Sequence, residues 1–280
     1  MSKTLKSFVC GEWREGAAPT RDLFNPLTDE VVATASSVGL DFSAVYDFAR
    51  KGGAALRALT FSERADLLDA VAKCINDARE PLIDLALENG GNTRKDAKFD
   101  IDGATATLAA YARFGRKLGD TNLILDNTPI RLSGNPRYVG QHIYTTKPGL
   151  ALHINAFNFP AWGMCEKLAV ALLAGVPVVT KPGTSTALVA HKIMEVLDAS
   201  GLLPEGALSM VIGGAGDMLD HLTSNDVVAF TGSAATGAVV KGNANIVANN
   251  VAVTVEADSL NAAVLCPAAV SYTHLTLPTT

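Results

Sequence analysis

Three polar residues stand where a folded chain could use them for chemistry. Each follows or ends a short apolar run in the sequence: Asn158, Lys181 and Glu256. The side-chain amide of Asn158 could donate a hydrogen bond to an oxygen that gains negative charge when a nucleophile attacks a carbonyl group. The carboxylate of Glu256 could take a proton from water as a general base, and Lys181 would place a cation at the same edge of a sheet.

Each of these residues also has an ordinary structural interpretation. Asn158 could cap or turn the chain before Pro160, and Lys181 could be a surface lysine. Asp258, two residues after Glu256, competes with it for a catalytic role, and we interpret Asp258 as a turn or cap residue.

Two glycine-rich turns are candidates for binding phosphate. Residues 213–216, Gly-Gly-Ala-Gly, follow an expected strand, but this turn lacks the GxGxxG spacing and is often only a tight turn. The segment from Thr231 to Gly237 is the stronger signal. Gly232 lets the backbone approach a ligand, and Ser233 begins the next helix, where N–H groups and the helix dipole favour a phosphate.

Alternating strands and helices must position these residues. Residues 153–183 predict a strand end, a loop, a buried helix, a buried strand and a second loop. Strands are expected near 150–155, 176–180, 208–212, 227–230 and 252–256, the last of them buried. This βαβ rhythm predicts an α/β fold with a Rossmann-like parallel sheet and helices on both faces, and such sheets bind ligands at the carboxyl ends of their strands.

The first half of the chain is expected to be scaffold. Short strands or an extended arm cover 8–13 and 23–32, and helices cover 42–59 and 97–118. Thr60 and Glu63 form a capping box, which predicts that a further helix begins after residue 60, between these two helices. Residues 127–148 predict an extended hairpin.

The composition and net charge of the chain limit the kinds of partner that it can bind. The chain has 280 residues and a net charge of −5, which argues against nucleic acid or an anionic membrane as the main partner. We find no signal peptide and no apolar run long enough for a membrane span, and expect a cytoplasmic protein. The four cysteines form no CxxC pair and are expected to be reduced and structural, and the histidines lack the close spacing of a metal site.

Four segments, in order, resemble the successive signatures of the NAD(P)-dependent aldehyde dehydrogenase superfamily. They are FNFPAWG, LLAGVPVVTKPGT, FTGSAATG and VEADSLN, and the resemblance runs to about Pro267. Their wording is most similar to the CoA-linked semialdehyde dehydrogenases of phenylacetate and benzoyl-CoA degradation.

The resemblance implies roles for particular residues. Asn158 falls on the oxyanion-hole asparagine, Glu256 on the glutamate that activates the hydrolytic water, and Lys181 on the lysine that binds the adenosine ribose. Thr184 replaces a glutamate that would repel a 2′-phosphate, whereas the threonine hydroxyl can donate to that group. We therefore expect NADP as cofactor, with NAD possible. The other expected cofactor-binding residues are Ile154, Ala156, Phe157, Gly214, Gly216, Phe230, Gly232, Ser233 and Gly237.

The resemblance also implies a domain organisation and a partner. Residues 1–126 would form the arm and helices of the cofactor domain, 127–148 a hairpin through which subunits form a homo-oligomer, and 149–270 the Rossmann-like core. The substrate would be a small aldehyde oxidised to the acid.

One part of the chemistry is missing from the sequence. In the family a nucleophilic cysteine lies several tens of residues beyond the glutamate, whereas Cys266 and Cys165 fall in apolar segments. Residues 271–280 do not resemble the family, and we expect a truncated sequence that is inactive as written. Two alternatives stay open: a non-catalytic nucleotide-binding module, and an acylating dehydrogenase, which Glu256 disfavours.

Overall fold

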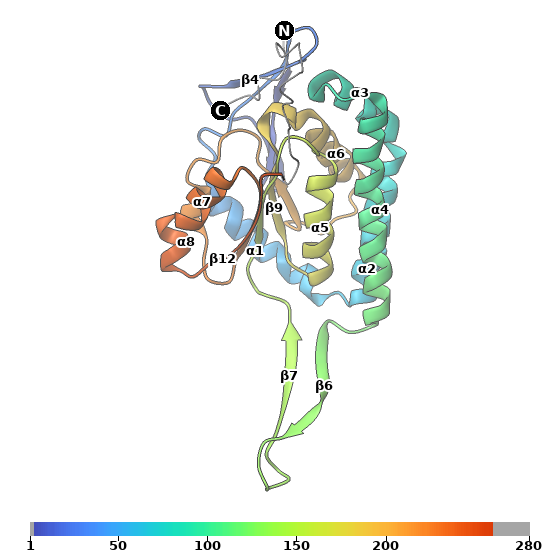
Figure 1. Cartoon of the computed structure of the whole chain (residues 1–280), viewed down its shortest axis with the longest axis vertical. Helices are drawn as coiled ribbons and strands as arrows, with labels where there is room; N and C mark the ends of the chain where they lie inside the picture. The colour runs from blue at the N-terminus through green and yellow to red at the C-terminus, as the bar shows by residue number, and fades with distance from the viewer. Residues whose placement is uncertain (1–2, 260–280) are drawn as a thin grey trace, which may run out of the picture.

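The computed structural model describes residues 3–259, and its centre is a seven-stranded mixed sheet (Figure 1). The strand order is β12-β11-β8-β9-β10-β2-β3, and neighbours among β8 to β12 run parallel. The bounds are β8 (Ala151–Ile154), β9 (Val178–Lys181), β10 (Leu208–Met210), β11 (Val227–Gly232) and β12 (Ala252–Ala257). The predicted α/β class and the positions of its five parallel strands are confirmed.

The N-terminal arm adds the antiparallel part of this sheet. β2 (Ser7–Val9) pairs with β10 and with β3 (Glu12–Arg14), while β1 (Lys3–Leu5), β4 (Arg21–Phe24) and β5 (Val31–Ala35) form a separate small sheet. The chain turns between β2 and β3 at Gly11 and between β4 and β5 after Asn25, where the sequence carries turn signals.

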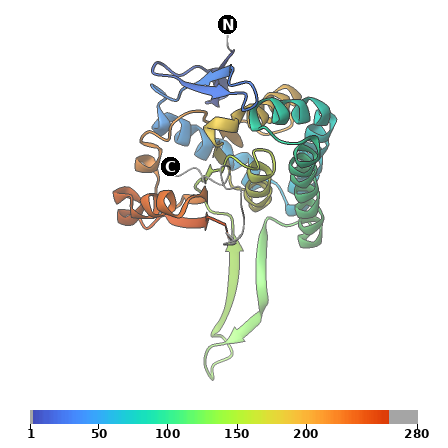
Figure 2. The same ribbon diagram turned by 45° about the horizontal axis from the view of Figure 1, so that its top comes forward.

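Helices cover both faces of the central sheet (Figures 1 and 2). One core joins the sheet to α2 (Phe61–Asp77), α3 (Arg79–Gly90), α4 (Arg94–Leu118), α5 (Trp162–Ala174) and α6 (Ala187–Ser200). The second core joins the other face to α1 (Phe42–Ala58), α7 (Ala234–Gly242) and α8 (Ala244–Ala248). Successive residues of β9 belong to different cores, Val178 to the first and Val179 to the second, because side chains alternate along a strand.

Helix boundaries follow local capping chemistry. The predicted capping box is present: the Thr60 hydroxyl accepts from the Glu63 backbone, and the Glu63 carboxylate accepts from the Thr60 backbone. α4 begins at Arg94, three residues before the predicted start, because the Thr93 hydroxyl accepts from the Asp96 backbone N–H. Short 3₁₀ turns cover η1 (Thr184–Thr186) and η2 (Met218–His221). In the described part of the chain, no helix has the length and apolar composition to cross a membrane.

A buried arginine joins two helix ends. The Arg64 side chain is fully buried, and its guanidinium donates to the backbone oxygens of Leu56 and Arg57 near the end of α1 and of Leu173 near the end of α5. The Leu56 oxygen also accepts from the Leu59 N–H at 3.2 Å, so the guanidinium adds to the local C-cap of α1. The negative end of each helix dipole favours a cation here. Burial lowers the pKa of Arg64, and the three carbonyl oxygens compensate the buried charge.

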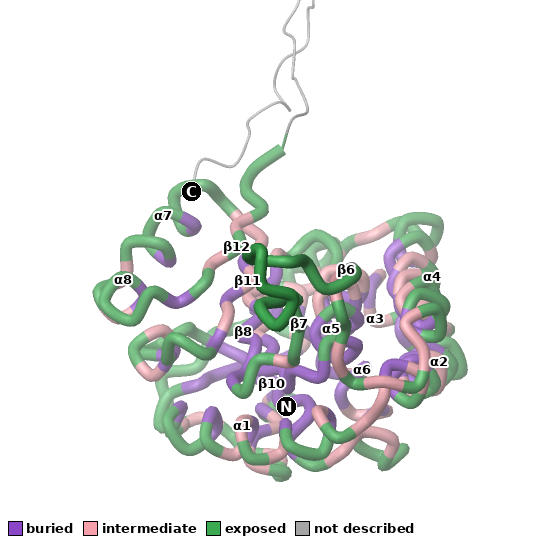
Figure 3. Tube along the Cα trace, turned by 90° about the horizontal axis from the view of Figure 1, so that it is seen from below, coloured by how far each residue is buried: buried purple, intermediate pink, exposed green. Residues whose placement is uncertain are grey.

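The predicted hairpin protrudes from the body (Figures 1 and 2). β6 (Leu123–Arg131) pairs antiparallel with β7 (Val139–Thr145), so the hairpin begins at residue 123, four residues before the predicted 127. Leu123 at the start of β6 pairs with Thr145 at the end of β7, so the two strands are paired up to the point where they join the body. Figure 3 shows that the hairpin is exposed, whereas the central strands are buried.

The last described strand differs from its prediction. The run VAVTVE is apolar and β-branched, which indicates a strand buried on both faces. Instead, β12 lies at one edge of the sheet, pairs only with β11 among the described strands, and exposes alternate residues. Glu256 is therefore exposed, and its expected place at the mouth of a buried strand is wrong.

Candidate functional site

The carboxyl ends of the parallel strands meet along one edge of the sheet. From β8 the chain adds β9 and β10 on one side and then β11 and β12 on the other, so the order reverses between β8 and β11. Ile154 pairs with Phe230 on β11 and with Lys181 on β9, which brings three predicted cofactor-binding residues to this edge. Open α/β sheets bind ligands beside such a reversal.

Asn158 lies in a loop that is held from the neighbouring strand. Asn155 donates through its backbone to the Lys181 carbonyl oxygen at 2.9 Å and through its side chain to the Thr180 hydroxyl at 3.0 Å. The Thr186 hydroxyl donates to the Phe157 carbonyl oxygen at 2.6 Å. Asn158 itself is exposed, and its amide makes no hydrogen bond to any described residue, so it can donate to a ligand.

A glycine permits this close approach of the two loops. A Cβ atom at Gly183 would lie 2.9 Å from both the backbone N and the Cα of Phe157. Real Cβ atoms essentially never come that close, so a larger residue would push the loop after β9 away from the loop that carries Asn158. The Lys-Pro-Gly segment thus fixes the spacing between two parts of the site.

Lys181 supplies a cation without a carboxylate partner. Its ammonium is largely buried at the end of β9, and the described residues offer it one long hydrogen bond, 3.4 Å to the Pro182 carbonyl oxygen. Burial, with the charge of Arg21, lowers the pKa of Lys181 to about 8. A cation in this condition favours an anionic or oxygen-rich ligand.

Thr184 does not present the free hydroxyl that the sequence suggests. Its side chain is buried, and its hydroxyl donates to the Gly213 carbonyl oxygen at 3.0 Å. A threonine hydroxyl has one proton, so in this geometry it cannot also donate to a 2′-phosphate. What remains from the prediction is the absence of a carboxylate at this position.

The turn at 213–216 is packed against the N-terminal arm. Gly213 has φ of +128°, and a Cβ there would lie 2.5 Å from the Ser37 backbone nitrogen. The Ser37 hydroxyl donates to the Gly214 carbonyl oxygen at 2.8 Å. Gly213, Gly214 and Gly216 line a cavity of about 480 Å³ with the arm, which includes Arg21.

The N-terminus of α7, where a phosphate is expected to bind, already donates hydrogen bonds to side chains of this chain. Ser233 caps α7 by accepting from the Thr236 backbone N–H at 3.2 Å, and the Asp258 carboxylate accepts from the Ala234 N–H at 2.9 Å. Asp258 is therefore a cap residue, as the sequence suggested. Its negative charge stands where a phosphate is expected, which sequence reasoning missed. Gly237 lets α7 approach β12, because a Cβ there would lie 2.8 Å from Val255.

Glu256 lies on the wall of a cavity of about 650 Å³. The Thr231 hydroxyl donates to its carboxylate at 3.1 Å. Trp162, Lys167, His153 and Phe230 also line this cavity, but Asn158 does not. The structure thus places Glu256 and Asn158 along the same sheet edge without bringing both to one cavity.

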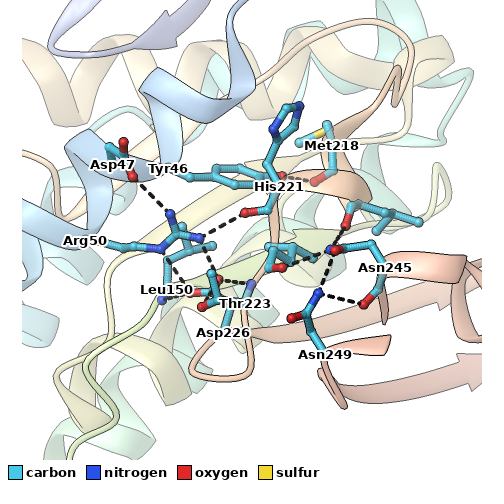
Figure 4. Close-up of polar contacts among 12 residues, drawn as sticks. Tyr46, Asp47, Arg50, Leu150, Met218, His221, Thr223, Asp226, Asn245 and Asn249 are labelled. Atoms are coloured by element: carbon cyan, nitrogen blue, oxygen red, sulfur yellow. Dashed lines mark hydrogen bonds and ion pairs between the residues drawn. The ribbon is translucent and has the colours of Figure 1, made fainter. Parts of the chain in front are cut away.

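A buried ion pair fixes the opposite ends of the same strands (Figure 4). The Asp226 side chain is fully buried and accepts from the Arg50 guanidinium at 2.7 Å, the Leu150 N–H at 2.9 Å and the Thr223 N–H at 2.7 Å. Burial favours the protonated acid, but these donors and the Arg50 charge hold the pKa of Asp226 below its usual value. The network fixes the starts of β8 and β11, and sequence reasoning missed it.

No described cysteine is suited to be a nucleophile at this edge. Cys10, Cys74 and Cys165 are unpaired, Cys165 is buried, and burial raises the pKa of both Cys10 and Cys165. Cys266 lies outside the described residues, as does the segment 271–280. No group of three or more His, Cys, Asp or Glu side chains in residues 3–259 could hold a metal ion.

Comparison with known proteins identifies the class. The sequence model of the aldehyde dehydrogenase family matches residues 13–271, so the chain belongs to that family of oxidoreductases. It is 46% identical over 264 residues to the 3,4-dehydroadipyl-CoA semialdehyde dehydrogenase of Aromatoleum evansii, covering 94% of this chain and 51% of the relative. It is 29% identical over 238 residues to the D-glyceraldehyde dehydrogenase (NADP(+)) of Picrophilus torridus, covering 83% and 46%.

Solved structures agree with this assignment. A betaine aldehyde dehydrogenase variant of Staphylococcus aureus, in complex with NAD+, superposes with a TM-score of 0.78 at 25% identity, over 90% of this chain and 50% of that one. The chain therefore spans about half the length of the relatives it matches.

Proposed function

We propose that the protein to which this chain belongs oxidises a CoA-linked semialdehyde to the carboxylic acid with NADP as cofactor. The observation that carries the proposal is the exposed amide of Asn158, held at the carboxyl edge of the sheet. The name of the Aromatoleum evansii relative gives the substrate class. The choice between phenylacetate and benzoyl-CoA breakdown stays a prediction.

Each residue has a defined task in this proposal. Asn158 donates to the carbonyl oxygen of the substrate as it gains negative charge. Glu256 takes the proton of the water that releases the acid, with its carboxylate oriented by Thr231. The nucleophile is a cysteine outside residues 3–259. The cofactor, when bound at this edge of the sheet, would supply a nicotinamide as the hydride acceptor.

The cofactor assignment rests on charge. Lys181 is a largely buried ammonium to which no residue in 3–259 offers a carboxylate, and position 184 carries no carboxylate to repel a 2′-phosphate. The name of the Picrophilus torridus relative includes NADP(+), which favours the same cofactor. Ser233 and the N-terminus of α7 would hold the pyrophosphate, with Asp258 leaving the Ala234 N–H. A titration in which NAD binds as tightly as NADP would contradict the preference.

The activity is tested in the full-length protein. Purified enzyme with a CoA-linked semialdehyde should form NADPH and the acid, and Asn158→Ala should slow the reaction by about 100-fold or more. Glu256→Gln should stop acid release while leaving a single turnover of NADPH intact. Release of a new acyl-CoA thioester would instead indicate an acylating dehydrogenase.

A non-catalytic nucleotide-binding role is the second candidate. This role is favoured because none of the three described cysteines lies at the carboxyl edge of the sheet as a reactive thiol. The chain of residues 1–280 should then bind NADP without oxidising aldehydes. If the full-length protein also lacks activity, this candidate replaces the first.

We also propose that the hairpin pairs subunits into a homo-oligomer. Its exposed apolar side chains are Ile124, Leu125, Ile130, Leu132, Tyr138, Val139, Ile143 and Tyr144. An exposed group of this kind marks an interaction surface, and a second copy carries the same edge for strand pairing. Ile143→Glu should lower the mass measured by light scattering to that of a smaller species. An unchanged mass for this variant would refute the role.

A further inference from the structure

The helix that follows the Asn158 loop is capped by a residue from another helix. Ala161, at the N-cap of α5, offers no side-chain acceptor. Instead, the buried carboxylate of Asp100 on α4 accepts from the Trp162 N–H at 2.7 Å and from the Ala161 N–H at 3.1 Å, one bond to each oxygen. Burial raises the pKa of Asp100 to about 6, and the two N–H donors oppose that rise, so the ionised acceptor predominates at pH 7.5.

Two further residues of α4 hold the indole of Trp162. The Trp162 ring lies against Gly103, where a Cβ would overlap the ring, and its Nε1–H donates to the Thr107 hydroxyl at 2.9 Å. Positions 100, 103 and 107 are spaced by three and four residues, so they share one face of α4. We call Asp100, Gly103 and Thr107 the α4 clamp.

The α4 clamp and strand β9 hold the two ends of the loop that carries Asn158. Upstream, Asn155 is bonded to β9, and the Phe157 carbonyl oxygen is bonded to Thr186. Downstream, the clamp fixes residues 161 and 162, and the Gly163 N–H donates back to the Phe159 carbonyl oxygen at 2.8 Å. Asn158 thus lies in the exposed segment 157–159 between two fixed points, one set by the sheet and the other by α4.

Aromatic contacts add to the downstream fixed point. The ring of Phe159 makes edge contacts with Phe99 on α4 and with Trp162, at centroid distances of 6.3 and 6.0 Å. Edge-to-face pairs of this kind are favourable and directional. The residue directly after Asn158 is therefore also tied to α4.

We propose that Asp100 is a positioning residue for Asn158, holding the side-chain amide of Asn158 where the negative oxygen develops. The inference rests on the proposed function of Asn158 as the oxyanion donor. Asp100 touches neither substrate nor cofactor; it acts through the backbone of residues 161 and 162. Catalytic hydrogen bonds are sensitive to displacement, and an error of about 1 Å costs up to about 100-fold in rate.

Asp100→Asn isolates the effect because it keeps size and shape. An asparagine can accept only one of the two N–H groups and turns an NH₂ donor toward the other. Asp102→Asn is the matched control, since Asp102 lies two residues along α4 and pairs with Arg79 at the surface. In the full-length enzyme, Asp100→Asn should slow NADPH formation per active site by about 10- to 100-fold, and Asp102→Asn by less than about twofold.

A double-mutant cycle with Asn158→Ala separates positioning from general damage. If Asp100 acts through Asn158, adding Asp100→Asn to Asn158→Ala should slow the reaction by less than about threefold more. Equal slowing in both backgrounds would overturn the inference, as would Asp100→Asn matching Asp102→Asn. The burst of NADPH gives the number of active sites, so unfolded protein does not enter the rate.

Further measurements separate a failure of the positioning role from a failure of the oxyanion assignment or of folding. If Asn158→Ala alone leaves the rate unchanged, the oxyanion assignment fails first and the positioning role falls with it. If Asp100→Asn does not fold, Thr107→Val, which removes only the acceptor of the indole, takes its place in the same cycle. Amide hydrogen exchange of residues 161–164 should accelerate in Asp100→Asn, and unchanged exchange would show that Asp100 does not hold this turn.

Discussion

The affinity of the chain for NADP should fall steeply above pH 8 because of Lys181. Burial and the nearby Arg21 lower the pKa of this ammonium to about 8, and no described carboxylate stabilises the charge. A bound 2′-phosphate would favour the protonated form and raise the pKa in the complex. Binding is therefore strongest below the pKa of the free chain and weakens as the pH rises above it.

The magnitude follows from the fraction of protonated lysine. If only the ammonium form binds, the apparent Kd is multiplied by one plus ten to the power of pH minus pKa, which is about 1.1 at pH 7 and about 11 at pH 9. If the neutral form also binds weakly, the increase ends where the pH passes the raised pKa of the complex. Between these limits the Kd should rise about tenfold for each pH unit.

Fluorescence titration of NADPH into the chain from pH 7 to 9.5 measures this directly. The second ionisation of a phosphate, near a pKa of about 6, is then nearly complete, which leaves Lys181 as the group under test. Lys181→Met should bind weakly with a flat profile, and Lys192→Met, at a surface lysine paired with Glu195, should keep the wild-type profile. A wild-type Kd constant within about twofold from pH 7 to 9, or the same slope in Lys181→Met, would refute the assignment.

Three further substitutions test the framework and the cofactor site. Arg64→Met removes the guanidinium donor from three backbone oxygens and should lower the free energy of unfolding by about 3–5 kcal/mol in urea denaturation; a loss under about 1 kcal/mol would contradict the two-helix cap. Asp226→Asn removes the buried carboxylate partner of Arg50, which then keeps only the exposed Asp47, and should cost about 3–5 kcal/mol at pH 7. Because the folded pKa of Asp226 is lowered, its contribution is present above pH 3.8 and is lost as the pH falls below it, so the variant should show a smaller loss in acid. Asp258→Asn removes a negative charge beside the expected phosphate and should tighten NADP binding by about two- to tenfold in the same fluorescence titration, whereas weaker binding would show that the charge is not in the cofactor's way.

The sequence predicts the parallel strands well because their signal is local. Residues 176–180 are apolar, lie between a C-capping glycine and a polar loop, and form β9 within two residues of the predicted ends. The capping box at Thr60 is equally local, since both partners lie within one helical turn. Such elements need no knowledge of distant residues.

The sequence could not predict features that depend on distant partners. The edge position of β12 exposes Glu256, although its residue types favour burial. The Thr184 hydroxyl is taken by Gly213, which lies 29 residues away and meets it only in the folded sheet. Asp100 likewise caps a helix that begins 62 residues later, and nothing in the pattern of α4 marks it as a cap.

Because Asp100 of α4 caps α5, this helix can begin without a capping residue of its own. A serine or aspartate at position 161 would cap α5 locally by accepting from the N–H of residue 163 or 164, at the usual strength of an N-cap. Such a cap would stabilise α5 but would leave the helix free to move with its loop relative to α4. Because Asp100 provides the acceptor from α4, the N–H groups are satisfied only when α5 and α4 are in register. The position of the loop that carries Asn158 therefore depends on the packing of α5 against α4.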